Sequence, residues 1–390
     1  MKKVLILHQH FKTPQSGGAI RSYYLAKALV EQGIRVVVIT AHSESSTRVE
    51  NVEGIEVHYL PVAYDNRFGF SERSRAFLKF ISQSTRLAGT IPDVDVCYAI
   101  SVPLTIGIAA LRIKLRYKVP YIFEVGDLWP DAPIQMGFIK NVFFKQSLYR
   151  LEKIIYKGAR SIVALSPMIQ STVQSRVSKK QVHLIPNMAD TEFFKPSVKN
   201  PDIEEKFGVR NKFVISYIGA IGLANRLEYF LECALACQME DLPVHFLLCG
   251  DGATLEELKK IHGQLNLRNF TFIPFQNRDG VSEVMNVTDA TFICYKPIPI
   301  LETGSPNKYF DGLAAGKLII INFKGWIKDE IEQHQCGFYI DPMQPIDLVE
   351  KIKRYLDKDH LLSAQQASRS LAESLYSRKK LSERFVSLFK

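Results

Sequence analysis

The segment with the richest chemistry is a short predicted helix in the second half of the chain, within ETGSPNKYFDGLAAGK from Glu302 to Lys317. Ser305 is a favourable N-cap for this helix. Free amide groups at its N-terminus and the ammonium group of Lys308 would attract an anion, and Asp311 lies three residues further along. An anion site flanked by carboxylates suits a sugar diphosphate, which presents both phosphates and hydroxyl groups. A helix that is capped for structural reasons alone is the alternative.

Glycine residues follow several predicted strands, at the turns that lead into helices. Glycine lets the backbone approach a ligand closely, and the following helix directs free N–H groups toward it. We expect these turns to contact phosphates or a sugar, with Arg226 as a forked donor to phosphate. The glycines are Gly17, Gly18, Gly219, Gly222 and Gly250. The first turn lacks the full G-x-G-x-x-G spacing, so a nicotinamide site is not favoured, and ordinary turns are the alternative.

A third candidate follows a buried predicted strand in the first half, where the sequence is FEVGDLWPD over residues 123–131. Acidic residues at the end of a strand, beside a tryptophan and a proline, are unusual for a plain connector. We expect Asp127 to lie in a cleft and to contact the reacting sugar or the acceptor. A loop carboxylate without a chemical role is the alternative.

Metal-binding patterns are weak in this sequence. Asp93-Val94-Asp95 has a DxD form, but it begins a predicted strand and we expect it to be structural. The nine histidines show no metal-ligand spacing, and the six cysteines contain no CxxC pair. We predict no metal site, no resident cofactor and buried free thiols.

The 390 residues exceed the size of one hydrophobic core, so two domains are expected. The first half alternates predicted strands and helices, and the second half repeats this pattern, which indicates α/β domains with mostly parallel sheets. The strands are expected at 3–8, 35–40, 95–100, 120–125 and 161–166, then at 213–219, 243–250, 270–274, 290–295 and 318–322. The first-half helices are expected at 19–32, 75–87, 102–116 and 141–158. A polar, proline-bounded linker is expected at 185–197.

The positive charge is concentrated in the first half. The chain has a net charge of +10, and residues 1–190 alone carry +11. Two stretches, 67–86 and 140–160, interleave Lys or Arg with Phe, Ile, Leu or Tyr, a composition that suits helices lying on anionic lipid. Surface helices packed on their own sheet are the alternative. No apolar run approaches the length of a membrane span or of a signal peptide, so we expect a cytoplasmic protein.

Taken together, these segments resemble glycosyltransferase family 4, of the GT-B fold, and within it bacterial enzymes that build cell-surface polysaccharides. The resemblance spans nearly the whole chain. It is carried by Gly17-Gly18…Arg21, Asp127-Leu128-Trp129-Pro130, Ile185-Pro186-Asn187, Gly219…Gly222, Gly250-Asp251-Gly252, Ser305-Pro306-Asn307-Lys308…Asp311…Ala314-Ala315-Gly316-Lys317 and Cys336-Gly337-Phe338.

The resemblance implies two Rossmann-like, doubly wound domains that face each other across a cleft. Residues 1–195 would bind the acceptor, residues 196–370 the nucleotide sugar, and 371–390 would return as a helix to the first domain. The reaction implied is a retaining, metal-independent transfer from a nucleoside diphosphate sugar, with UDP as the expected nucleotide.

The resemblance also implies roles for individual residues. Asp311 would hold the ribose and Glu302 would touch the donor sugar, while Lys308 and Arg226 would stabilise the leaving diphosphate. Compared with the usual family pattern, Glu302 and Asp311 are nine residues apart rather than eight.

The basic face favours a polyprenyl-diphosphate-linked saccharide as the acceptor and an anionic membrane surface as a partner. The expected donor sugar is an N-acetylated hexosamine or a deoxysugar. A sugar-nucleotide 2-epimerase, or a non-catalytic partner that binds sugar nucleotides, are the other functions considered. Nucleic acid is not an expected partner, because the basic helices match no nucleic-acid-binding module.

Overall fold

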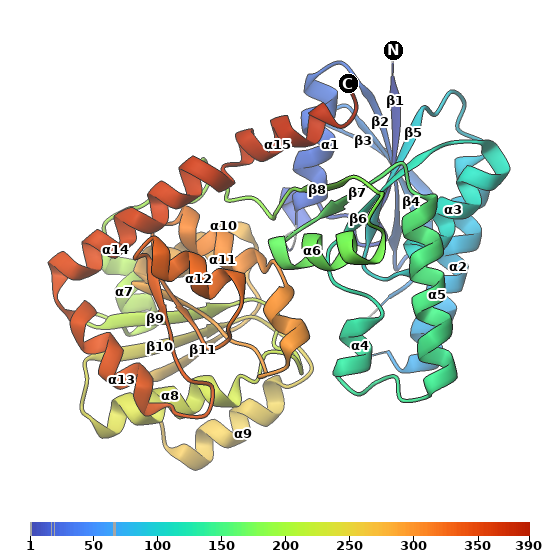
Figure 1. Ribbon diagram of the computed structural model, residues 1–390. Coiled ribbons are helices and arrows are strands. Elements are labelled where there is room, and N and C mark those ends of the chain that lie inside the picture. The colour runs from blue at the N-terminus through green and yellow to red at the C-terminus, as the bar shows by residue number, and fades with distance from the viewer. Residues whose placement is uncertain (1, 17, 19, 65–67) are drawn as a thin grey trace.

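The computed structural model describes residues 2–16, 18, 20–64 and 68–390. The chain forms two α/β domains, each built on a largely parallel sheet with helices packed against it (Figure 1). In β1, Val4 and Ile6 pack into a core with Leu25, whereas Leu5 and Leu7 pack into another core with Phe80. The first sheet is therefore covered on both faces, as expected for continuous apolar strands. The predicted two-domain α/β class is confirmed.

The first sheet has eight strands in the order β3-β4-β2-β1-β5-β6-β7-β8, all parallel except for β3, which runs antiparallel to β4. Its strands are β1 (Lys3–Leu7), β2 (Arg35–His42), β3 (Arg48–Val52), β4 (Ile55–Pro61), β5 (Val96–Ser101), β6 (Tyr121–Val125), β7 (Ser161–Ala164) and β8 (Val182–Leu184). Its helices are α1 (Arg21–Glu31), α2 (Phe70–Ala88), α3 (Thr105–Tyr117), α4 (Asp131–Gln135), α5 (Val142–Gly158) and α6 (Pro167–Arg176).

The second sheet has six parallel strands in the order β11-β10-β9-β12-β13-β14. Its strands are β9 (Phe213–Ile218), β10 (Val244–Cys249), β11 (Phe270–Ile273), β12 (Ala290–Ile293), β13 (Leu318–Ile321) and β14 (Gly337–Tyr339). The helices of this half are α7 (Pro201–Phe207), α8 (Glu228–Met239), α9 (Leu255–Leu265), α10 (Arg278–Val287), α11 (Asn307–Ala314), α12 (Trp326–Gln333), α13 (Ile346–Ile352) and α14 (Lys358–Leu371). A 3₁₀ helix, η2 (Pro299–Thr303), precedes α11.

The strand order fixes where a ligand can bind. β1 lies between β2 and β5, and β9 lies between β10 and β12, so the chain changes direction across the sheet at these strands. In doubly wound sheets, ligands bind beyond the carboxyl ends of the strands at such a point. β9 ends at Ile218, directly before Gly219, and the segment after β12 leads through η2 into α11.

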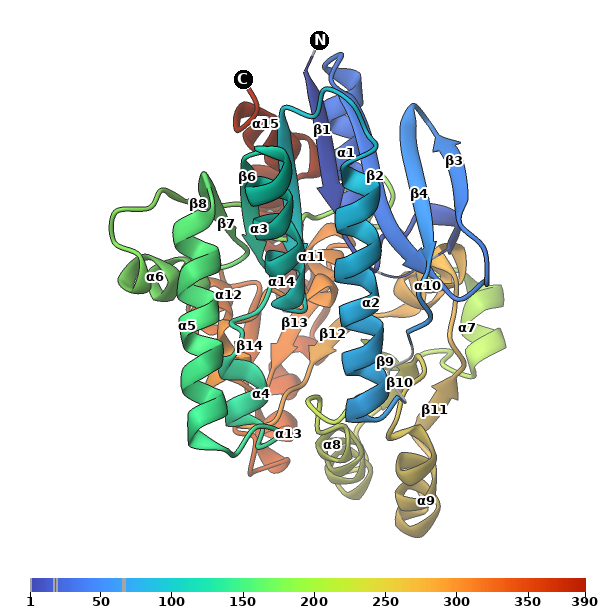
Figure 2. The same cartoon turned by 90° about the vertical axis from the view of Figure 1, so that its right-hand side faces the viewer.

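The chain ends on the first domain. After α14, a π-helical turn (Ala372–Tyr376) leads into α15 (Arg378–Ser387), which packs beside α1 (Figures 1 and 2). The ring of Phe385 lies edge-on to Tyr98 of β5 at 4.7 Å between centroids. Among the described helices, none has both the length and the apolar character needed to cross a membrane.

Arg21, at the start of α1, belongs to the core of the first domain. Its guanidinium pairs with Glu124 of β6 at 3.0 Å and donates to the carbonyl oxygen of Ile185 at 2.9 Å. Tyr98 also donates to Glu124. These bonds compensate a carboxylate in the middle of the sheet and tie the linker to it. Arg21 therefore contacts protein groups of the first domain and the linker, and it also lines a small cavity beside α1.

Replacing Arg21 by methionine is expected to lower the free energy of unfolding by about 3–5 kcal/mol, because it leaves the Glu124 charge buried and uncompensated. Urea unfolding followed by circular dichroism measures this change. Arg35, which is exposed at the start of β2, provides the control, and Arg35→Met should change the stability by less than about 0.5 kcal/mol. Equal effects of the two substitutions would contradict the core role of Arg21.

Candidate active site

A cavity of about 740 Å³ lies between the two domains. Asp127, shortly after β6, lines it from the first domain, and Tyr295, shortly after β12, lines it from the second. Burial raises the pKa of Asp127. Burial also raises the pKa of the Tyr295 phenol, and the nearby Asp127 carboxylate raises it further. The structure thus brings the predicted cleft carboxylate against a residue of the other domain.

Lys308 lies in the first turn of α11, which begins at Asn307; its N-cap residue is Pro306 rather than the expected Ser305, and no side chain caps it. Its Nζ atom donates to the Tyr217 hydroxyl at 2.7 Å and lies 4.0 Å from the centre of that ring. Burial lowers the pKa of Lys308 to about 7. The Lys308 Nζ is also 5.9 Å from the ring of Tyr295, so Tyr295 lies near both Lys308 and Asp127. A desolvated cation at this position would interact strongly with an incoming anion.

The glycine turns of the second domain pack closely on one another and on Lys308. Gly219 has φ +143°, and a Cβ atom there would lie 3.3 Å from Cε of Lys308. A Cβ atom on Gly250 would lie 2.0 Å from the carbonyl oxygen of Gly219, which excludes any side chain. The N–H of Gly222 donates to the side chain of Asn225 at 3.2 Å. Gly219 therefore makes room for Lys308, whereas Gly250 lets the two turns approach.

Arg226 makes its contacts within the second domain. One Nη atom donates to the carbonyl oxygen of Pro342 at 2.9 Å, and the guanidinium lies 5.7 Å from the centre of the Tyr229 ring. The residue has φ +44°, in the left-handed region. Part of the Arg226 guanidinium, which was expected to bind phosphate, is thus already bonded to protein.

Glu302 does not line the interdomain cavity. Its neighbours Leu301, Thr303 and Gly304 do, because η2 turns successive side chains in different directions. The Glu302 backbone packs against Gly325, where a Cβ atom would lie 2.8 Å from the Glu302 carbonyl oxygen. The contact of Glu302 with the donor sugar stays a prediction.

Asp311 lines a second, smaller cavity of about 110 Å³, together with Gly18, Asn277 and Arg278. Burial raises the pKa of Asp311 to about 7, although the nearby Arg278 acts in the opposite direction. The spacing predicted that Lys308 and Asp311 share a helical face, but they contact different groups. Gly18 lines the same cavity from the first domain. Gly17 lies outside the described residues.

Asp311→Asn is expected to stabilise the free protein, and to do so more strongly as the pH rises. The pKa of Asp311 is about 7 in the folded protein against an ordinary value of 3.8, so wild-type stability falls as the pH rises between these values. Asparagine carries no charge, and the gain should reach about 1–3 kcal/mol near pH 8. Chemical unfolding at several pH values measures it, with the exposed Asp279→Asn as control. A gain that is the same at pH 4 and pH 8 would contradict the burial of this charge.

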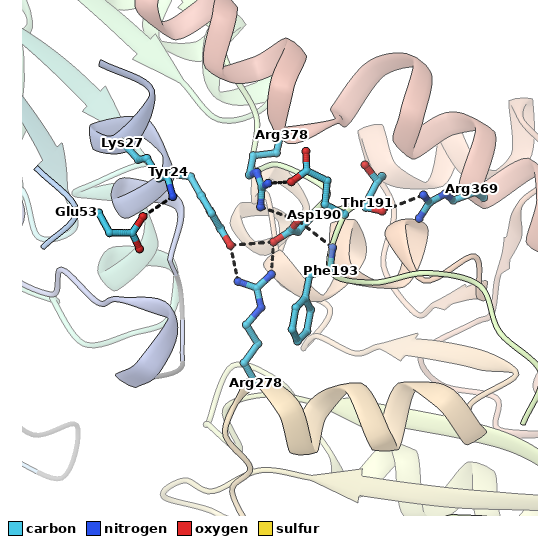
Figure 3. Close-up of polar contacts among 10 residues, drawn as sticks. Tyr24, Lys27, Glu53, Asp190, Thr191, Phe193, Arg278, Arg369 and Arg378 are labelled. Carbon is cyan, nitrogen blue, oxygen red and sulfur yellow. Dashed lines mark hydrogen bonds and ion pairs between the residues drawn. The ribbon is translucent and has the colours of Figure 1, made fainter. Parts of the chain in front are cut away.

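A polar cluster joins the domains beside this smaller cavity (Figure 3). Asp190 of the linker pairs with Arg278 of α10 and with Arg378 of α15, the latter at 2.9 Å. Tyr24 of α1 donates to Asp190 at 3.0 Å and accepts from Arg278 at 2.7 Å. The guanidinium of Arg278 also lies 3.9 Å from the centre of the Phe193 ring. Both domains, the linker and the C-terminal helix thus meet at Asp190.

The start of α11 is also held by the first domain. Ser166 donates to the carbonyl oxygen of Thr303, and the Asn187 side chain donates to that of Ser305, both at 2.5 Å.

Three residues near the site, Tyr217, Tyr295 and Arg278, were not predicted from the sequence. Tyr217 stands two residues before Gly219, but an aromatic residue in a buried strand is more often part of a core.

The DxD segment has a structural role, as expected. Asp95 accepts the N–H of Lys3 at 2.7 Å, and Asp93 has φ +57° in the turn before β5. Within the residues described, no group of three or more His, Cys, Asp or Glu side chains has the geometry to hold a metal ion. All six cysteines are buried and free.

Comparison with known families is consistent with this geometry. Residues 16–188 match the model of the glycosyl transferase 4-like domain, and residues 199–371 match that of glycosyl transferases group 1. The chain belongs to the family 4-like glycosyltransferases of the GT-B fold.

Individual relatives are distant. A Bacillus subtilis protein named as a teichuronic acid biosynthesis glycosyltransferase is 24% identical over 65% of this chain and 62% of its own length. An Escherichia coli UDP-Gal:α-D-GlcNAc-diphosphoundecaprenol α-1,3-galactosyltransferase is 26% identical over 42% of each chain. The solved structure of Anabaena HepE with UDP and glucose superimposes with a TM-score of 0.71 at 15% identity, covering 100% of this chain and 99% of that one. The sequence matches thus span about half the length of these curated relatives.

Proposed function

We propose that this protein transfers a sugar, with retention of anomeric configuration, from a nucleoside diphosphate donor to a lipid-linked saccharide during synthesis of a cell-surface polysaccharide. One observation carries this proposal: Tyr295, which lines the interdomain cavity together with Asp127 of the first domain, also lies close to Lys308 of the second domain. This arrangement suits a reaction whose two substrates bind to different domains.

The donor would bind at the second domain. The buried ammonium group of Lys308 and the N-terminus of α11 would stabilise the negative charge that develops on the leaving diphosphate. Asp311 would accept hydrogen bonds from the ribose in the smaller cavity, close to Gly18. The proposed donor is a UDP-sugar, with an N-acetylated hexosamine or a deoxysugar as the transferred group. The solved HepE complex holds UDP and glucose on the same fold, which supports this choice of nucleotide.

The acceptor would approach from the first domain, toward Asp127. The acceptor in the name of the E. coli galactosyltransferase is a sugar on diphosphoundecaprenol, and a lipid-linked acceptor of this class is proposed here too. The exposed faces of α2 and α5 carry Lys and Arg beside exposed apolar side chains, which supports peripheral binding to an anionic membrane on its cytoplasmic side.

Release of nucleoside diphosphate from UDP-, GDP-, ADP- and dTDP-sugars, with and without bacterial lipid extract, tests the proposal. Release that requires both one particular donor and the lipid is the expected result. Addition of EDTA should leave the rate unchanged, since a metal-independent reaction is proposed. Nucleotide binding without release would favour a non-catalytic partner, and conversion of the donor sugar to its 2-epimer without lipid would identify an epimerase.

A further inference from the structure

The interdomain cavity extends from Asp127 into the first domain between α2, α4 and α5 and is mostly apolar. Its wall in this direction is formed by Phe68, Phe77, Trp129, Met136, Phe138 and Phe144. The cavity opens at the surface beside Phe138 and Phe144, which are 63% and 45% exposed. Figure 2 shows α2 and α5 on this side of the molecule, with α4 close to the end of α5.

Such a wall is poorly suited to a saccharide alone. Sugar hydroxyls need hydrogen-bonding partners when they leave water, and this apolar part of the wall offers few of them. Apolar surface that remains open to water is costly, so a pocket of this composition favours an aliphatic ligand. The polar end of the cavity, at Asp127 and Tyr295, is where the reacting sugars would lie.

The charge around the opening indicates what the aliphatic ligand carries. Between residues 140 and 160 the chain has one carboxylate, that of Glu152, which is buried and paired with Arg176. Two cations of this segment are close in sequence to the opening: Lys140, which is exposed and follows Phe138 by two residues, and the half-buried Lys145, which follows Phe144 directly. An aliphatic chain attached to phosphate complements both the apolar wall and its cationic surroundings.

We propose that this apolar extension holds the isoprenoid chain of the acceptor lipid, so that the chain lies in the protein while its phosphate-linked saccharide reaches Asp127. The inference rests on the proposed function and adds to it the place of the lipid. It also predicts that the binding affinity rises with chain length, because each further isoprenoid unit buries more apolar surface in the cavity.

Binding of isoprenyl monophosphates to the Trp326→Phe variant tests this inference. The chain has two tryptophans, and Trp326 lies in the second domain, so this variant leaves Trp129 in the cavity wall as the sole reporter. Titration with dimethylallyl, geranyl and farnesyl monophosphate should change the Trp129 fluorescence. We expect the dissociation constant to fall by at least about tenfold for each added unit. Equal dissociation constants for the three ligands would overturn the inference.

Matched variants locate the bound chain. Ala132→Phe fills part of the cavity, and Met136→Lys places a charge in its wall at a half-buried position. Both should weaken farnesyl monophosphate binding by at least about tenfold and leave the dimethylallyl compound nearly unaffected. Phe143, which is 76% exposed and does not line the cavity, is the control, and Phe143→Ala should have no effect. Weakening by Phe143→Ala as strong as that by Ala132→Phe would instead place the lipid on the outer face of α5, and would overturn the inference.

Transfer activity, measured on the same preparations, separates this inference from the proposed function. If nucleoside diphosphate release needs lipid but binding does not depend on chain length, the result supports the transferase and contradicts the site for the isoprenoid chain. If binding depends on chain length but no nucleoside diphosphate is released, the result supports the site for the isoprenoid chain and contradicts the transferase.

Discussion

Lys308→Ala is expected to lower kcat/KM for the nucleotide sugar by about a hundredfold to a thousandfold. The ammonium group is buried against Tyr217 and close to Tyr295, where little solvent screens it from a diphosphate. Binding of free nucleoside diphosphate should weaken by about 1.5–3 kcal/mol, the contribution of a charge-assisted hydrogen bond. Isothermal titration calorimetry and initial rates measure the two effects.

The stability of the Lys308 variant distinguishes a site residue from a structural one. Because burial lowers the pKa of Lys308 to about 7, the free protein bears a cost for holding this group charged, and alanine should not lower the Tm. Lys317, at the end of the same segment, is a matched buried lysine near Asp289. Lys317→Ala should leave nucleotide binding unchanged. Unchanged nucleotide affinity in Lys308→Ala would contradict the position of the donor site.

Asp127→Asn should lower kcat by about a hundredfold and leave nucleotide binding intact, because Asp127 belongs to the first domain. Burial raises the pKa of this carboxyl group, so wild-type activity should rise with pH as the group loses its proton. The asparagine variant should lack this rise. Rates measured across the acid range, with nucleotide affinity measured in parallel, check both expectations.

Asp131 provides a control for Asp127 in the same segment. It pairs with Arg176 at 2.9 Å, and so Asp131→Asn should lower stability more than it lowers the rate. Full activity of Asp127→Asn would mean that this carboxylate is only part of a loop.

The sequence was sufficient to predict much of the architecture, for identifiable physical reasons. The buried strands are continuous apolar runs, as in KVLIL of β1, and a parallel sheet covered on both faces requires such runs. The helix that carries Lys308 was predicted, but the expected cap was wrong, because Pro306 rather than Ser305 occupies the N-cap position. Four strands were missed: β3 is mostly exposed and lacks an apolar run, its partner β4 is buried only at intervals, and β8 and β14 have three residues each.

The candidate site was predicted only in part, because its contacts join distant segments. Asp190 and Arg278 are far apart in the chain, and no local pattern indicates that they pair. The orientation of Glu302 depends on the 3₁₀ geometry of η2, which the spacing of acidic residues does not reveal. Arg21 and Glu124 are likewise far apart in the chain, and no local pattern indicates that they pair in the core.

Transfer of radiolabelled sugar from the active UDP-sugar into the butanol-extractable lipid of a bacterial membrane extract tests the central claim most directly. Wild-type protein should move the label into the lipid, whereas Lys308→Ala and Asp127→Asn should not do so at a comparable rate. Label that stays in the aqueous phase, although the wild-type protein binds the nucleotide, would contradict sugar transfer to a lipid acceptor at this site.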